Sequence, residues 1–259
     1  MLQQLTEKDF LVLRGPFESK RQSPKSLGGI LMLGMLLQVL LLSAEYYGSQ
    51  YSTFPFKIEI FKIHLIISII LAVGSIIFAI PSVYMRYQKM QYFINTLVSQ
   101  NLGGLSFYIL ALLVLGNDLS DKSEELLTFT YITLIIGLVI FIATSIRFYM
   151  LLKKGKYRKG TNKDQQRRYF ETNSLLPIVI PAGIGIVFMI QYLIRTFNFG
   201  GVDTIVMSTL MVVLFYAMLF VLPEQLVLQY CKTRFDSFNY EQNGLLKPVR
   251  DEEGNIIME

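Results

Sequence analysis

Apolar residues gather in blocks of about 20 residues along this 259-residue chain, and these blocks constrain its fold more than any other feature. A helix rises about 1.5 Å per residue, so about 20 residues cross the ~30 Å hydrocarbon layer of a bilayer. The polar segments between the blocks are too short for a separate folded domain. The pattern predicts an all-α polytopic membrane protein with six transmembrane helices, at about 27–47, 63–84, 92–115, 126–152, 175–194 and 204–222, the last able to continue to 228.

The most basic stretch of the chain, residues 150–171, lies between the fourth and fifth blocks. Loops rich in Lys and Arg stay on the cytoplasmic side of a membrane. If both termini share that side, it also receives every Lys and Arg of the chain except Lys57, Lys62, Lys122 and Arg195. We therefore expect a multi-pass protein of the cell membrane, with a cytoplasmic N-tail at 1–26, a transmembrane domain at 27–228 and a cytoplasmic C-tail at 229–259.

The reactive side chains argue against catalysis and against a bound metal. Cys231 is the single cysteine and His64 the single histidine, which is too few for a disulfide or a histidine-based metal site. No phosphate-binding loop of the Gly-x-x-x-x-Gly-Lys type occurs. Glu45 and His64 are expected near the outer ends of their spans, where a Ser–His nucleophile has no plausible geometry. We expect no enzyme activity and no cofactor.

A few polar or helix-breaking residues fall inside the predicted spans and are the candidates for an intramembrane site. The third block has a polar first half that could line an aqueous path, although side-chain amides in a bundle more often bond to neighbouring helices. Prolines in the fifth block could break that helix and free carbonyl groups, or only bend it. A carboxylate after the sixth block could bind a cation or lie at the interface. These residues are Asn95, Gln100, Asn101, Pro177, Pro181 and Glu224.

The basic loop has two interpretations of its own. It could contact anionic lipid headgroups, or its charge could serve only to hold the loop in the cytoplasm. The residues expected at such a lipid contact are Lys153, Lys154, Lys156, Arg158, Lys159, Arg167 and Arg168.

The short loops and the lack of a catalytic motif favour a non-enzymatic protein of bacterial type, an accessory, assembly or toxin-immunity factor. Its partners would be membrane lipids and another membrane protein or a toxin, with no nucleic acid. The alternative is a small transporter. The layout of six spans with both ends inside is similar to that of ABC-2-type permease subunits, over the whole chain but without a shared motif. That resemblance implies a separate ATPase and a coupling helix at the inner face, near 84–91.

Overall fold

The computed structural model describes residues 2–118, 123–172 and 202–250, and over these residues the protein is helical without a strand. Near the N-terminus lie the 3-10 helices η1 (Leu2–Gln4) and η2 (Glu7–Arg14). The α-helices follow as α1 (Gly15–Glu18), α2 (Pro24–Tyr51), α3 (Lys57–Ala79), α4 (Pro81–Arg86), α5 (Gln88–Gln100), α6 (Ser106–Asp118), α7 (Ser123–Lys153), α8 (Asn162–Thr172) and α10 (Val202–Arg234). A π-helical turn, η3 (Asn101–Leu105), joins α5 to α6, and the 3-10 helix η4 (Asp236–Phe238) follows α10.

Five of these helices are long and apolar enough to cross a membrane: α2, α3, the continuous helix Gln88–Asn117, α7 and α10. This confirms the prediction of a helical fold over the described residues, and the five candidate spans support the prediction of a multi-pass membrane protein. The span predicted at 175–194, with Pro177 and Pro181, lies outside the described residues.

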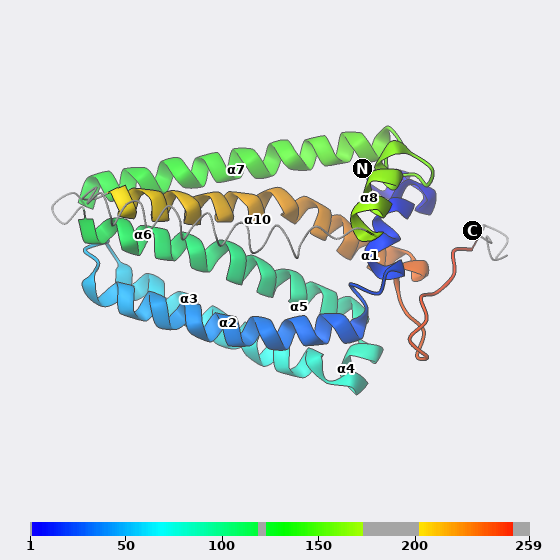
Figure 1. The fold of residues 1–259 in the computed structure, drawn as a ribbon, viewed down its shortest axis with the longest axis horizontal. Helices are drawn as coiled ribbons and strands as arrows, with labels where there is room; N and C mark the ends of the chain where they lie inside the picture. The colour runs from blue at the N-terminus through cyan, green and yellow to red at the C-terminus, as the bar shows by residue number, and fades with distance from the viewer. Residues whose placement is uncertain (1, 119–122, 173–201, 251–259) are drawn as a thin grey trace.

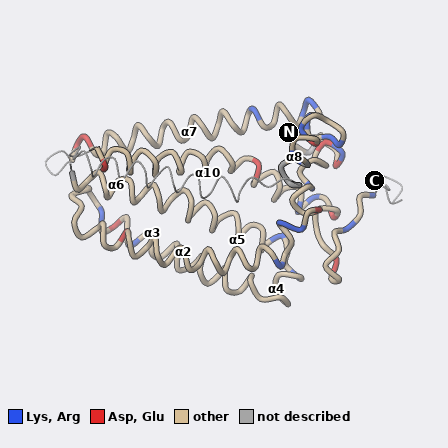
Figure 2. Tube along the Cα trace, in the orientation of Figure 1, with Lys and Arg blue, Asp and Glu red and all other residues tan. Residues whose placement is uncertain are grey.

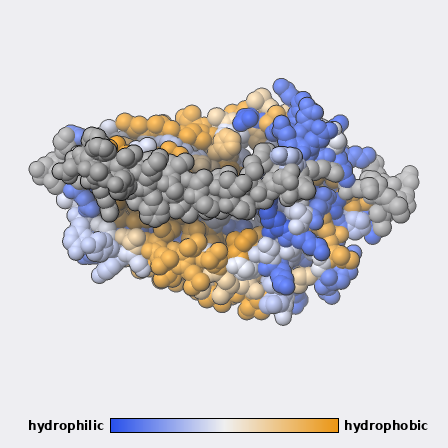
Figure 3. Space-filling view, viewed as in Figure 1, coloured by the Kyte–Doolittle hydropathy of each residue, from blue (hydrophilic) through white to orange (hydrophobic). Residues whose placement is uncertain are grey.

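The long helices run side by side in one elongated bundle (Figure 1). Charged residues gather at its two ends (Figure 2), and the described surface between the ends is hydrophobic (Figure 3). The terminal end holds the N-terminal segment, α8 and the segment after α10, whereas the loop end holds the connection from α2 to α3 and the end of α6. Large side chains such as Leu40, Ile70 and Ile135 are exposed along the middle, which suits contact with lipid tails.

The helix Gln88–Asn117 occupies the centre of this arrangement. It packs against α2 and α3 on one side and against α10 on the other. Of its most apolar 18-residue window, 56% is buried, against 28% or less for the other four spans. A helix surrounded by protein can bury polar side chains that find partners, which explains why this span was the least apolar of those predicted.

Several boundaries differ from those predicted, and two of them involve a proline. The second span was expected to reach residue 84, but α3 ends at Ala79, because Pro81 has no N–H to donate and pushes Ile80 into an extended conformation. A short helix, α4, begins at Pro81. At the other boundary, α10 continues through Pro223 to Arg234, past the expected limit at 228.

A small hydrophobic cluster closes the terminal end. Phe10, Leu13 and Phe17 from the N-terminal segment are fully buried and pack with Phe238 and Tyr240 from the segment after α10. An ion pair of 2.7 Å from Asp9 to Arg158 ties this cluster to the turn after α7. Burial raises the pKa of the Asp9 carboxyl, but hydrogen bonds from Arg158 and Thr6 outweigh that effect and leave the pKa below its ordinary value. The N-terminal segment is therefore an ordered part of the fold.

Candidate functional site

Three helices bring six polar side chains together inside the bundle. They come from α2, α3 and the junction of η3 with α6, and each is no more than 6% exposed: Gln38, Glu45, His64, Ser68, Asn101 and Ser106. We call this group the buried network. Polar groups are costly to place at membrane depth, and a carboxylate is the most costly of these, so their convergence on one place marks it as the leading site of the molecule.

Glu45 and His64 form the ionisable part of the buried network. Oε2 of Glu45 lies 2.6 Å from Nδ1 of His64, and the two side chains are 0% and 1% exposed. Glu45 is six residues from the end of α2, and His64 is seven residues from the start of α3. At about 1.5 Å per residue, the pair lies roughly 10 Å inside the loop end of the bundle.

Asn101 connects this pair to the middle of the bundle. Its amide nitrogen donates to Oε1 of Gln38 at 3.0 Å and to the hydroxyl of Ser68 at 3.1 Å, and its oxygen lies 3.2 Å from Nε2 of His64. Gln38 in turn donates to Ser106 at 3.1 Å. One continuous set of hydrogen bonds therefore links α2, α3 and the central helix.

The directions of these bonds determine how many protons the network holds. With the amide orientations of this structure, Asn101 donates its two amide protons to Gln38 and Ser68, so its oxygen accepts from His64, and Nε2 of His64 carries a proton in this arrangement. His64 is then either an imidazolium beside the Glu45 carboxylate or a neutral ring that accepts from protonated Glu45. In both forms the pair carries two protons and no net charge, the state that a low-dielectric interior favours.

The backbone departs from regular α-helix where Asn101 joins the network. The π-helical turn Asn101–Leu105 begins at this residue and contains Gly103 and Gly104. A Cβ added at Gly103 would lie 3.0 Å from the sulfur of Met218 on α10, so a larger residue would crowd that contact. Single π turns inside α-helices are frequent at functional sites, because they reposition side chains without ending the helix.

Within the described structure, the buried network contains one oxygen without a hydrogen bond and borders one small cavity. Oε1 of Glu45 is buried and accepts no hydrogen bond from the described residues, which costs about 1–3 kcal/mol. A small cavity of about 10 Å³ borders Gln38, Ser68, Ser75 and Asn101, roughly the space of one water molecule. The network is thus closely packed, with room for little more than a proton or a water.

Sequence reasoning missed the charged pair. It placed Glu45 and His64 near the outer ends of their spans, and the structure shows both buried and paired. The signal that could have found them is spacing. Gln38 and Glu45 are seven residues apart and His64 and Ser68 are four apart, so each pair lies on one helix face.

The predicted polar and kink residues are spread over several places. Asn101 belongs to the buried network, whereas Gln100 donates to Gln225 at 2.8 Å and to the carbonyl of Met218 on α10. Asn95 is half-buried on α5 and lies outside the network. Glu224 has no cation beside it in the sequence, but the structure supplies one, because Nη2 of Arg167 from α8 lies 2.5 Å from its carboxylate.

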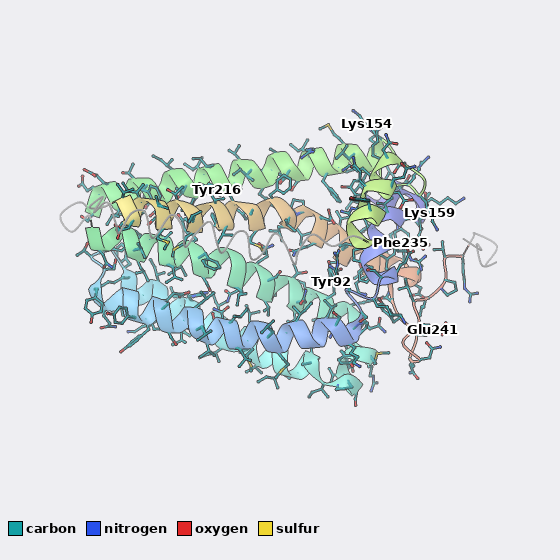
Figure 4. The ribbon with its side chains drawn as sticks, viewed as in Figure 1. Tyr92, Lys154, Lys159, Tyr216, Phe235 and Glu241 are labelled. Carbon is teal, nitrogen blue, oxygen red and sulfur yellow. The ribbon has the colours of Figure 1, made fainter. Side chains whose placement is uncertain are left out.

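The residues predicted to contact anionic lipid lie around the turn between α7 and α8. Lys154 and Lys159 project from this turn (Figure 4). Their neighbours Lys153 and Lys156 are also exposed, whereas Arg158 pairs with Asp9, and Arg167 pairs with Glu224. The Arg168 side chain lies outside the described part of the structure.

Ser68, His64 and Glu45 also stand in the order of a nucleophile, a base and an orienting carboxylate, with 3.4 Å from the serine hydroxyl to Nε2. Sequence reasoning found no plausible geometry for a Ser–His nucleophile and did not anticipate this proximity, and the absence of enzyme activity stays a prediction. The site nevertheless has no room for a substrate, since Ser68 is 1% exposed and the adjoining cavity holds about one water. The arrangement is better suited to holding a proton than to acyl transfer.

No family model matches the chain, and no curated protein or solved structure matches it either. The argument about function therefore rests on the chemistry of the buried network.

Proposed function

We propose that the protein is a small proton-coupled transporter of the bacterial cell membrane, with six spans and both termini in the cytoplasm. The observation that supports it is the fully buried Glu45–His64 pair, joined by Asn101 to three helices. Ionisable side chains inside a membrane are found on ion pathways and proton relays, because little else offsets the cost of burying them. In this proposal, binding and release of a proton at the pair change the packing of the helices.

The hydrogen-bond directions supply the coupling. When the pair loses one proton, it carries a net negative charge and one proton remains. If that proton stays on Nδ1 of His64, Nε2 is left without one. If it stays on Nε2, the Glu45 carboxylate has no hydrogen-bond donor among the described residues. If Nε2 becomes an acceptor, it faces the Asn101 oxygen, which is also an acceptor. Relief requires the Asn101 amide to turn over, which reverses the direction of its hydrogen bonds to Gln38 and Ser68. A change in proton number is thereby transmitted from α3 to α2 and to the π turn.

An accessory or toxin-immunity function, with another membrane protein or a toxin as the partner, remains a separate prediction. The two functions differ in what they require of the buried network. A transporter must open it to water from each side of the membrane in turn, whereas a binding protein has no need to open it.

Labelling of introduced cysteines tests this difference, because the native Cys231 is buried. Ser106→Cys reports access to the network from the loop end, and Ser75→Cys reports access from the terminal end. A water-soluble maleimide that does not cross membranes is added to vesicles of each orientation, and rates are divided by that of the exposed Asn117→Cys to remove the pH dependence of thiol chemistry. We expect the normalised rates to rise as the pH is raised, because opening of the network is linked to the release of one proton.

Two variants sharpen the test. Glu45→Gln cannot release a carboxyl proton, so it should label slowly at every pH, whereas Glu59→Gln removes an exposed carboxylate from the same helix pair and should behave as the unmodified protein. Labelling from one end only would contradict transport and favour the accessory function. A network that never labels at any pH would overturn both proton coupling and transport.

A further inference from the structure

A pocket of about 370 Å³ lies between α7, α10 and the turn that leads to α8. It is separate from the buried network, and the proposed function does not depend on it. Its walls divide by chemistry. One part is apolar, with Phe148, Leu151, Phe220 and Val221, and the other is polar, with Arg147, Tyr157, Lys163 and Glu224.

The polar part has more positive than negative charge. Arg167 stands beside the pocket and pairs with Glu224 at 2.5 Å, so these two charges offset each other. Lys163 donates to the hydroxyl of Tyr157 at 3.0 Å and lies 4.4 Å from the centre of its ring. Arg147 lines the pocket and makes no hydrogen bond or ion pair with another described side chain. Two cations, Arg147 and Lys163, are therefore left without a carboxylate partner among the described residues.

These cations repel each other in a partly desolvated place. Burial, followed by the charges of Arg167 and Arg147, lowers the pKa of the Lys163 amine. Burial likewise raises the pKa of the Tyr157 hydroxyl, which therefore stays protonated and able to donate. An anion between Arg147 and Lys163 would relieve the repulsion and could accept hydrogen bonds from both.

The position of the pocket indicates what kind of anion fits. Arg147 is six residues from the end of α7, about 9 Å along the helix, which places it where the hydrocarbon layer gives way to headgroups. Phe220 and Val221 on α10 are 52% and 43% exposed, which suits contact with a hydrocarbon chain. A ligand that fits both walls has a phosphate at one end and a hydrocarbon chain at the other.

We propose that this pocket binds the phosphate headgroup of one anionic phospholipid, held by Arg147 and Lys163, with its acyl chain against Phe220 and Val221. This site differs from the exposed basic turn expected from the sequence, because it is a defined cavity with an apolar wall and its two cations were not among the residues predicted there.

Native mass spectrometry of the full-length, delipidated protein tests the proposal with two added probes. The probes are dioleoyl phosphatidylglycerol and the zwitterionic dioleoyl phosphatidylcholine, which have the same chains. We expect one phosphatidylglycerol to bind before any phosphatidylcholine. Arg147→Gln/Lys163→Gln should weaken that binding by roughly tenfold or more, since each cation near an anionic headgroup contributes substantially. Lys153→Gln/Lys154→Gln removes the same charge from exposed positions and should change it little.

A further variant keeps every charge and tests whether weaker lipid binding comes from the loss of the site or from misfolding. Val221→Trp narrows the apolar wall and should also weaken binding of phosphatidylglycerol, while the elution volume of the protein stays unchanged. Equal losses in the two double variants would show diffuse attraction to a basic surface and overturn the site. Complete displacement of the lipid by an equal concentration of inorganic phosphate would show a site for soluble phosphate and overturn its assignment to lipid.

Discussion

At the scale of single residues, Glu45 and His64 stabilise the fold only as a pair. Both are buried. Removing His64 would leave the Glu45 carboxyl without a described partner, and removing Glu45 would leave Nδ1 of His64 without one. Breaking a buried ion pair from one side costs about 3–5 kcal/mol, whereas removing both partners costs much less than the sum.

This gives a prediction for a double-mutant cycle. Glu45→Ala and His64→Ala should each lower the free energy of unfolding by about 3 kcal/mol, and the double variant should lose at least about 1 kcal/mol less than their sum. Unfolding in detergent micelles, followed by circular dichroism, measures the three values. Ser43→Ala serves as the control, because Ser43 is exposed and donates only to Val39 of its own helix. Strict additivity would show that the two side chains act independently.

The same residues show how far the sequence could lead. Asn101 was a candidate because an amide in an apolar block stands out, but Glu45 and His64 lie close enough to the predicted span ends to pass as interfacial. Their burial depends on the loop of only a few residues after Tyr51, which brings α3 back against α2, and on the central helix that covers both. Those are contacts between elements, and a one-dimensional hydropathy pattern does not contain them.

At the scale of helices, the structure explains which spans were easy to predict. The spans with little buried surface, such as α3 and α7, are nearly all apolar. The sequence located α7 within a few residues, whereas α3 begins and ends five or six residues before the predicted span. The central helix has fewer apolar residues because Gln91, Gln100 and Asn101 bond to its neighbours. Gln91 also donates to the carbonyl of Phe78, at the point where Pro81 interrupts α3. Its side chain thereby satisfies a group that the break leaves unbonded, a compensation that only the folded structure shows.

Close packing of α7 against α10 depends on a glycine. A Cβ added at Gly137 would lie 2.9 Å from Cδ1 of Leu219, with the rings of Phe215 and Tyr216 also nearby. Small residues of this kind let membrane helices approach and pack by van der Waals contact. Replacing this one should push the two helices apart.

We therefore expect Gly137→Leu to lower the free energy of unfolding by about 1–3 kcal/mol, the usual cost of overpacking. Gly29→Leu on α2 is the matched control, because a Cβ there meets no atom within 4 Å. Thermal melting of both variants in the same detergent compares them, and the control should melt close to the unmodified protein. A Gly137→Leu protein as stable as the control would mean that α7 and α10 are not tightly packed at this point.

At the scale of the whole molecule, the exposed apolar band and the two charged ends agree with a membrane orientation (Figures 2 and 3). The described chain leaves off after α8 at the terminal end and resumes with α10 at the loop end (Figure 1). Two features of the topology remain predictions. One is a sixth crossing at about 175–194, and the other is the direction in which the bundle faces. The second rests on the basic terminal end, which includes the turn after α7.

The orientation of the bundle can be tested with one introduced cysteine near the end of α6 and another just after the end of α7. Asn117 is exposed at the loop end and Lys154 is exposed at the terminal end, so each replaced by Cys reports one side of the membrane. In intact cells, a maleimide that does not cross membranes should label Asn117→Cys, whereas Lys154→Cys should be labelled only after the cells are opened. Lys247→Cys, on the segment after α10, should behave as Lys154→Cys if both termini are cytoplasmic. The reverse pattern would mean that the basic turn faces outward, against the rule that positive loops stay inside. If Lys154→Cys and Lys247→Cys are labelled on different sides, the chain crosses the membrane an odd number of times between residues 154 and 247. That result would contradict the prediction that both termini are cytoplasmic.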